Sequence, residues 1–166
     1  MKMLALALLA ASPAMAADQP YRGCGTPRVE YDSDLLPIFS QRAVLAINLA
    51  AVSGGKPTPA LERLIDPAAR FSSGAGDVGI PLPRGAAGAI ALARQMHADT
   101  FRFLGWNYIP SPLTDPCGKH QVQVEFIDTR GKTIFPVTFT FEKGRIVAAE
   151  GWRRTFQSGR IAPVRR

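Results

Sequence analysis

The sequence predicts one α+β domain, with helices in its first part and antiparallel strands in its last part. Apolar residues recur at helical spacing up to about residue 104, and the pattern changes to period two from residue 120. Two short turns that contain glycine, at Arg130-Gly131 and Lys143-Gly144, divide the last part into three strands. The 166 residues, 46% of them hydrophobic, supply enough apolar side chains for one core.

The first sixteen residues have the layout of a secretory signal peptide. Lys2 precedes an apolar run from Met3 to Ala11, and Ala14-Met15-Ala16 forms a small-x-small cleavage site. The run is about half of the ~20 residues that a spanning helix needs, so the sequence predicts cleavage and export without a membrane span. We expect a periplasmic or secreted protein with a signal peptide at 1–16, an N-terminal extension at 17–33, a domain at 34–156 and a basic tail at 157–166.

The two cysteines, Cys24 and Cys117, both lie in turn-rich sequence of the mature chain. In an oxidising compartment a single pair of this kind predicts one disulfide. The pair lacks the histidines of a metal site and the spacing of a C-x-x-C redox motif, and no cluster of Cys, His, Asp or Glu has metal-ligand spacing, so we expect no metal site. We also expect no cofactor. The disulfide is expected to pin residues 17–33 against the start of the strand region.

Positive charge is in excess after removal of Lys2, with 19 basic and 13 acidic residues and a net charge of +6. Much of the excess lies near the C-terminus, where a basic tail could bind nucleic acid or an anionic membrane. Aromatic residues are scarce in the tail and no nucleic-acid-reading motif is present. A solvated basic surface is therefore the favoured interpretation, and we expect no nucleic-acid partner.

Local signals define the helices in order. A long helix follows Ser33-Asp34 and stops at Gly54-Gly55, and Thr58-Pro59 begins a short helix with an N-cap and a proline in the first turn. We expect a short edge strand from Phe71 and then a long loop. A second substantial helix is predicted from about Ala86 to Leu104, with an inward stripe that contains Ile90, Ala93, His97, Phe101 and Leu104.

The three last strands are predicted by alternation, and their hydrophobic faces predict the register. Phe126 is expected opposite Phe135, Val124 opposite Val137, and Val122 opposite Phe139. His120, at the start of the first of these strands, is expected to be exposed.

Glu150 is the residue whose direction the turns decide. A two-residue Lys143-Gly144 turn pairs Phe141 with Ile146 and Val137 with Glu150, which points Glu150 into the apolar face. A three-residue loop with a glycine bulge turns Glu150 to the other face, and Pro136 is a further candidate bulge. The inward direction is favoured, and both directions remain open.

Three stretches carry a resemblance to a known superfamily: "LIDPAARF", "RGAAGAIAL" and "FEKGRIVAAEGW". In this order, over residues 34–156, the chain resembles the nuclear transport factor 2-like superfamily, which includes ketosteroid-isomerase-like and polyketide-cyclase-like proteins. The resemblance implies a cystatin-like α+β cone, in which a curved antiparallel sheet wraps around helices and encloses one pocket, often in homodimers. It assigns no catalytic residue, because the sequence offers no matching Asp-plus-Tyr constellation.

Two polar residues are expected on inward surfaces, His97 on the long helix and Glu150 on the sheet. Together they would form a general acid–base pair. The alternatives are a satisfied core histidine and a glutamate paired with an arginine at the sheet rim. The expected ligand-binding residues are aromatic side chains that line the pocket or belong to its core: Trp152, Trp106, Phe71, Phe101 and Phe139.

Three functions are compatible with these features. The favoured one is an exported module that binds a small hydrophobic or amphipathic molecule. The second is a cofactor-free isomerase, lyase or dehydratase that uses His97 and Glu150 for proton transfer. The third is a dimerising or envelope-interaction protein, whose outer sheet face would be built from Ile134, Val147 and Ala149 and would form a homodimer contact.

Overall fold

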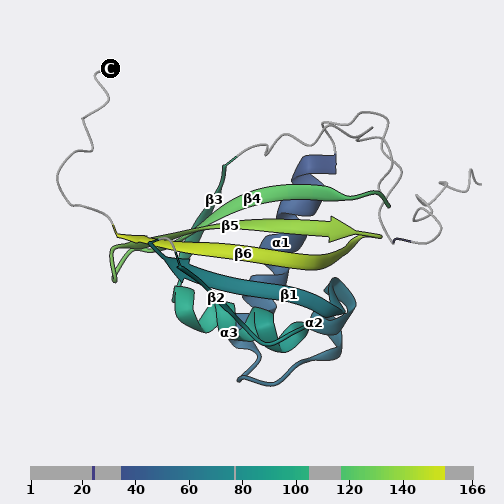
Figure 1. Ribbon diagram of the computed structural model, residues 1–166, viewed down its shortest axis with the longest axis horizontal. Helices are drawn as coiled ribbons and strands as arrows, with labels where there is room; N and C mark the ends of the chain where they lie inside the picture. Colours follow the sequence, from purple (N-terminus) through teal and green to yellow (C-terminus); the bar gives the residue numbers. More distant parts are fainter. Residues whose placement is uncertain (1–23, 25–34, 77, 105–116, 156–166) are drawn as a thin grey trace, which may run out of the picture.

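The computed structural model describes residues 24, 35–76, 78–104 and 117–155. In this part of the chain three helices pack against one sheet of six strands (Figure 1). The helices are α1 (Leu35–Val52), α2 (Pro59–Leu64) and α3 (Ala86–Met96). The strands are β1 (Ile65–Ala75), β2 (Val78–Pro81), β3 (Thr100–Phe103), β4 (His120–Asp128), β5 (Thr133–Glu142) and β6 (Arg145–Thr155).

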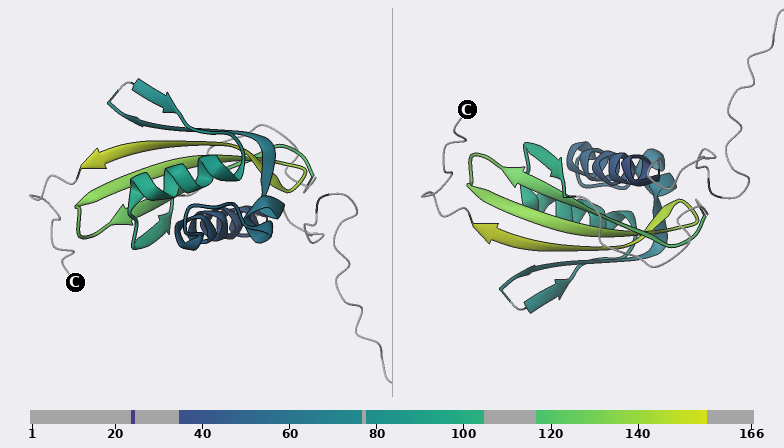
Figure 2. Two further views of the ribbon diagram at one scale, coloured as in Figure 1. Left: turned by 90° about the horizontal axis from the view of Figure 1, so that it is seen from below. Right: turned by 90° about the horizontal axis from the view of Figure 1, so that it is seen from above.

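The strands lie in the order β2-β1-β6-β5-β4-β3. β1 runs parallel to β6, and every other neighbouring pair is antiparallel. Figure 2 shows that α1 and α3 cover one side of the curved sheet, called the inner face here, and that the free end of the β1–β2 hairpin projects away from the helices. The predicted α+β architecture with a curved, mainly antiparallel sheet around helices is confirmed.

The first two helices begin and end where the sequence predicts. α1 ends before Gly54 and Gly55, which both have positive φ values (63° and 91°). The Thr58 hydroxyl caps α2 by accepting a hydrogen bond from the backbone N–H of Leu61 (3.3 Å), and Pro59 is in the first turn.

By length and composition, α1 is the one helix among the described residues that could cross a membrane. Its apolar side chains are instead used in the core, where Leu35, Phe39 and Ile47 are buried. A core helix near the N-terminus passes the same test of length and hydropathy. The burial of α1 thus accounts for its apolar sequence.

The region after α2 differs from the expected short strand and long loop. β1 begins at Ile65 and continues to Ala75, and β2 returns beside it after Gly76, whose φ is +66°. β1 is also an internal strand, because β6 pairs with it on the side opposite β2. Serine and glycine at residues 72–76 weaken the strand pattern, and the tertiary pairing on both sides overrides it.

α3 begins after Gly85 and is shorter than predicted. A Cβ on Gly88 would stand 2.7 Å from a ring carbon of Phe71, so the glycine lets α3 lie directly against β1. The helix ends at Met96, and His97 is the C-cap residue in the left-handed region (φ 48°), where its N–H donates to Ala93. Residues 100–103 then form β3 in place of a last helical turn.

The predicted β4–β5 register is confirmed. Phe126 lies opposite Phe135, Val124 opposite Val137 and Val122 opposite Phe139. The connection has four residues, 129–132, because Asp128 pairs with Thr133.

The β5–β6 hairpin begins as predicted and then shifts. Lys143 and Gly144 both have positive φ (51° and 74°), as a two-residue hairpin turn requires, and Phe141 pairs with Ile146. Beyond this pair the register shifts by one residue at Val147, so that Thr140 lies opposite Ala148. This β-bulge places Glu150 opposite Thr138 rather than Val137, and the predicted inward direction of Glu150 is wrong.

The core lies between the helices and the inner face of the sheet. Its largest fully buried side chains come from both layers and include Phe39, Leu92, Met96, Phe139, Phe141 and Ile146. Ala149 also belongs to this core, which corrects its expected place on the outer face. His120, expected to be exposed, is buried and stacks on Phe39 with 4.7 Å between the ring centroids.

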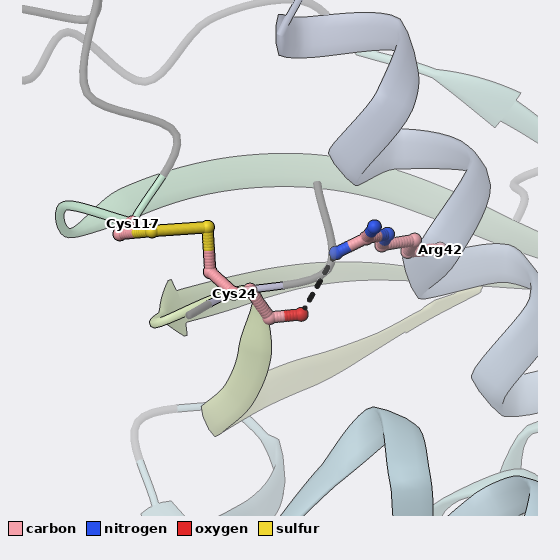
Figure 3. Close-up of a disulfide and its surroundings, with 4 residues drawn as sticks. Cys24, Arg42 and Cys117 are labelled. Carbon is pink, nitrogen blue, oxygen red and sulfur yellow. Dashed lines mark hydrogen bonds between the residues drawn. A yellow bond between two sulfur atoms is a disulfide. The ribbon is translucent and has the colours of Figure 1, made fainter. Parts of the chain in front are cut away.

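The predicted disulfide is present between Cys24 and Cys117, with 5.5 Å between the Cα atoms (Figure 3). The carbonyl of Cys117 accepts a hydrogen bond from the N–H of Lys143 (3.0 Å), and Arg42 Nη1 donates to the carbonyl of Gly144 (3.0 Å). A Cβ on Gly144 would stand 2.1 Å from the carbonyl oxygen of Cys24. The bridge therefore joins Cys24, the chain entering β4 and the β5–β6 turn at one end of the sheet.

Candidate functional site

A pocket of about 180 Å³ opens between α1, the end of α3 and the strands β3 and β4. It lies at the edge of the helix–sheet core, where β3 is the last strand of the sheet. The residues that line it are Ile47, Asn48, Ala51, Ala93, Met96, Ala98, Asp99, Thr100, Phe101 and Phe126.

The floor of this pocket is apolar and its rim is partly polar. Ile47, Met96 and Phe126 are buried, whereas Phe101 on β3 keeps 42% of its surface exposed. Phe101 pairs with Phe126 across the strands, so both side chains lie on the inner face of the sheet. Asn48 from α1 and Thr100 from β3 add hydrogen-bonding groups. The pocket thus combines an apolar interior with a few polar contacts at its entrance.

An exposed aromatic surface continues from the pocket along β3. The rings of Phe101 and Phe103 are tilted against each other, with 5.5 Å between their centroids. Phe103 is 48% exposed. Large apolar side chains of this kind at a pocket entrance are typical of a binding surface.

Asp99, the carboxylate on the rim, is already bound within the protein. It accepts hydrogen bonds from the Thr129 hydroxyl and from the Thr129 backbone N–H (3.3 Å). These bonds, the hydroxyl bond first, lower the pKa of Asp99 below its ordinary value. The ionised carboxylate of Asp99 therefore holds the β4–β5 turn. Because its pKa is low and its oxygens already accept these bonds, it is a poor general base.

The structure separates the two residues expected to form an acid–base pair. His97 is exposed at the C-cap of α3, on the helix side of the sheet. Glu150 is exposed on the opposite face, because its neighbours Ala149 and Gly151 are the residues of β6 that face inward. The sheet lies between the two side chains, and the predicted His97–Glu150 pair is wrong.

The expected aromatic ligand contacts have different places. Phe101 lines the pocket. Phe71 and Phe139 are buried in the core, and Phe139 is completely covered. Trp152 lies on the outer face over Gly74, and Trp106 is outside the described residues.

Sequence reasoning missed Asn48, Thr100 and Phe103. The signal for the last two is the alternating stretch "TFRF", which continues the apolar face of β4 on a new edge strand. Asn48 gives no comparable signal, because it is one polar residue on a helix that is apolar around most of its circumference. Among the described residues, no group of three or more His, Cys, Asp or Glu side chains could hold a metal ion.

No protein-family model and no curated protein matches the sequence. Among solved structures, an NTF-2 like protein of unknown function from Silicibacter pomeroyi DSS-3 is 15% identical, with a TM-score of 0.50 over 75% of this chain and 99% of that one. A phenazine biosynthesis-related protein from Pseudomonas aeruginosa is 13% identical, with a TM-score of 0.41 over 81% and 94% of the two chains. A protein of unknown function with a cystatin-like fold from Methylobium petroleophilum PM1 is 13% identical, with a TM-score of 0.42 over 76% and 82%.

At 15% identity, the likeness to the first of these structures shows the fold alone. The three helices and the curved sheet of six strands in the described part of the chain fit this fold. The chain has the nuclear transport factor 2-like fold.

Proposed function

We propose that the protein binds a small molecule, of which an aromatic ring or a short hydrocarbon chain enters the pocket between α1, α3 and β3. The observation that carries this proposal is the aromatic wall of Phe101, 42% exposed, above a floor of buried apolar side chains. An exposed aromatic ring beside an apolar hollow gains from covering by a ligand.

The volume sets the size of the group that enters. A dry apolar cavity of about 150 Å³ holds one benzene ring, so about 180 Å³ accommodates one ring or a chain of similar size. The rest of a larger ligand would lie over Phe103, whose ring contacts that of Phe101 at the entrance. Asn48 and Thr100 would bind a hydroxyl or carbonyl group at the rim.

Binding is favoured over catalysis by the polar groups of this pocket. The one carboxylate that lines it belongs to Asp99, which Thr129 holds in the ionised form, and His97 and Glu150 lie apart. Proton transfer needs a base within hydrogen-bond reach of the substrate, with a pKa near the working pH. The described pocket residues offer an orienting surface rather than an acid–base pair.

The experiment is a titration with single-ring probes followed by amide chemical shifts. Benzyl alcohol and cyclohexanol are expected to shift the amides of Ile47, Ala93 and Phe126 in a saturable manner. Ala51→Phe places a ring in the pocket from an exposed position of the wall and is expected to weaken binding about tenfold.

The matched control is Ala87→Phe, at an exposed position of α3 that does not line the pocket. This variant is expected to bind like the unchanged protein. Saturable shifts that spread over the whole molecule, or equal binding by both variants, contradict the proposal.

We also propose that the protein is exported. The disulfide between Cys24 and Cys117 and the signal-like residues 1–16 support this. Expression of the full chain in a bacterial host, followed by N-terminal sequencing of the exported fraction, is expected to give a mature protein that begins at Ala17. Recovery of the chain only in the cytoplasm, with Met1 intact, contradicts export.

A further inference from the structure

A second concave site lies on the outer face of the sheet, away from the helices. It is a groove of about 360 Å³ across β6, β1 and the chain that follows β2. The residues that line it are Arg70, Phe71, Ser72, Pro81, Leu82, Arg84, Ala148 and Glu150. The free end of the β1–β2 hairpin projects on this side of the sheet (Figure 2).

The backbone fixes the positions of the polar groups in the groove. Arg70 and Ser72 stand on the middle strand, and Ser72 lies beside Glu150 of β6. On the other side of β1, residues 82–85 continue the hairpin ladder, with Leu82 donating to Phe71 (2.9 Å) and Gly85 donating to Ala69 (3.0 Å). Arg84 therefore stands on the chain next to the one that carries Arg70.

Among the described residues, the two guanidinium groups in the groove are without an ion-pair or hydrogen-bond partner. Within the described part of the chain, the one ion pair between an arginine and a carboxylate joins Arg102 to Glu125. Arg70, Arg84 and Glu150 make no hydrogen bond or ion pair there. Two unneutralised arginines in one hollow raise the local positive potential, and their planar donors match carboxylate and phosphate oxygens.

We propose that this groove binds a small organic anion, a carboxylate or a phosphate ester, through Arg70 and Arg84. Ser72 adds a hydroxyl donor, and Pro81 and Leu82 offer an apolar surface to the hydrocarbon part of the same ligand. Glu150 lines the groove beside Ser72 and repels a second negative charge, so that it favours monoanions over dianions. This assigns a role in specificity to the glutamate that sequence reasoning had placed in a catalytic pair.

Three soluble probes separate the contribution of the anionic group from that of an attached aromatic ring: inorganic phosphate, phenyl phosphate and benzoate. Amide chemical shifts in the intact disulfide-bonded protein are expected to move at Arg70, Ser72, Arg84 and Glu150, with tighter binding of the two aromatic anions. Arg70→Gln and Arg84→Gln are each expected to weaken that binding about tenfold. Glu150→Gln is expected to strengthen the binding of phenyl phosphate more than the binding of benzoate.

The control variant is Arg130→Gln, which removes the same charge from an exposed turn outside the groove. It is expected to bind as the unchanged protein does. Because Arg70 and Arg84 are both exposed and stand on different segments, failure of one variant to fold leaves the other as the test.

Absence of chemical-shift changes in the groove would overturn the proposal. Shifts that do not saturate, or equal weakening of binding by Arg130→Gln, would overturn it as well, because the net positive charge of the protein would then explain the binding. Binding only to vesicles with phosphatidylglycerol, with no response to the soluble probes, would overturn it in favour of a membrane surface. The site is independent of the inner pocket, so Ala51→Phe is expected to leave anion binding unchanged.

Discussion

The indole ring of Trp152 lies directly over Gly74, its cross-strand neighbour on β1. A Cβ on Gly74 would stand 2.5 Å from Cζ3 of the ring and 2.6 Å from the carbonyl oxygen of Val78. The ring reaches further to Gly79 on β2, where an added Cβ would stand 3.7 Å away. Trp152 thus covers a pair of glycines on the outer face, and this contact holds the β1–β2 hairpin to β6.

Gly74→Ala is expected to lower the free energy of unfolding by about 1–3 kcal/mol, because the added methyl group meets both a ring and a backbone oxygen. Urea denaturation followed by tryptophan fluorescence measures the change. Gly79→Ala is the matched control and is expected to be neutral or slightly stabilising, because its methyl group has room. Equal stability of the two variants would show that Trp152 does not rest on Gly74 in solution.

Loss of the disulfide is expected to destabilise the fold without abolishing it. The bridge closes a loop with a sequence separation of 93, for which the chain-entropy estimate gives about 4–5 kcal/mol as an upper value. The double variant Cys24→Ser/Cys117→Ser is expected to unfold at lower urea concentration and to keep its circular dichroism spectrum. Thiol titration of the denatured, unreduced protein is expected to find no free thiol, and two free thiols would contradict the bridge.

Asp99 is expected to titrate below its ordinary pKa of about 3.8 because Thr129 donates to its carboxylate. A carboxyl group whose pKa is lower in the folded state stabilises the fold above its unfolded pKa, and this stabilisation is lost as the pH falls below about 3.8. In Thr129→Val the pKa of Asp99 is expected to rise toward the ordinary value, whereas Thr129→Ser keeps it low. The carboxyl chemical shift of Asp99, measured against pH in both variants, tests this prediction. Equal pKa values in the two variants would contradict it.

The ion pair of Arg102 and Glu125 joins an exposed to a buried side chain. The arginine side chain is 64% exposed and that of the glutamate 6%. Arg102→Met is expected to cost about 1–3 kcal/mol of unfolding free energy, because it leaves a buried carboxylate without its donor. The double variant Arg102→Met/Glu125→Gln is expected to recover part of this loss, and thermal unfolding of the single and double variants tests the coupling.

The sequence was most informative where the apolar faces were unambiguous. The β4–β5 register followed from Val122, Val124 and Phe126, since a shift by one residue would have exposed all three. The caps of α1 and α2 followed from Gly54 and Thr58, whose roles depend on local geometry alone.

The positions of the candidate site residues were harder to predict, because they depend on where helix α3 ends and on where strand β6 bulges. His97 fits the apolar stripe of α3 in the sequence, but its left-handed conformation ends the helix and starts the turn into β3. The bulge at Val147 lies in the run Val147–Ala148–Ala149, where small apolar residues suit either face and hide the change of alternation. The outer groove needs Arg84 beside Arg70, which only the return of the hairpin brings about.

Because of the bulge at Val147, the face on which each later residue of β6 lies depends on a local backbone conformation as well as on the alternation of the sequence. If Val147 paired with Thr140 as in a regular ladder, the residues that follow it in β6 would exchange faces, and Glu150 and Trp152 would turn toward the helices. Deletion of Val147 would instead remove the extra residue and leave Glu150 opposite Thr138. In a fold whose strand has an interior side and a solvent side, loss of a bulge without loss of any residue therefore moves a carboxylate from the outer groove to the core side of the sheet. Substitutions that suppress or introduce such a bulge offer a route by which relatives of this fold acquire an interior acid or lose one.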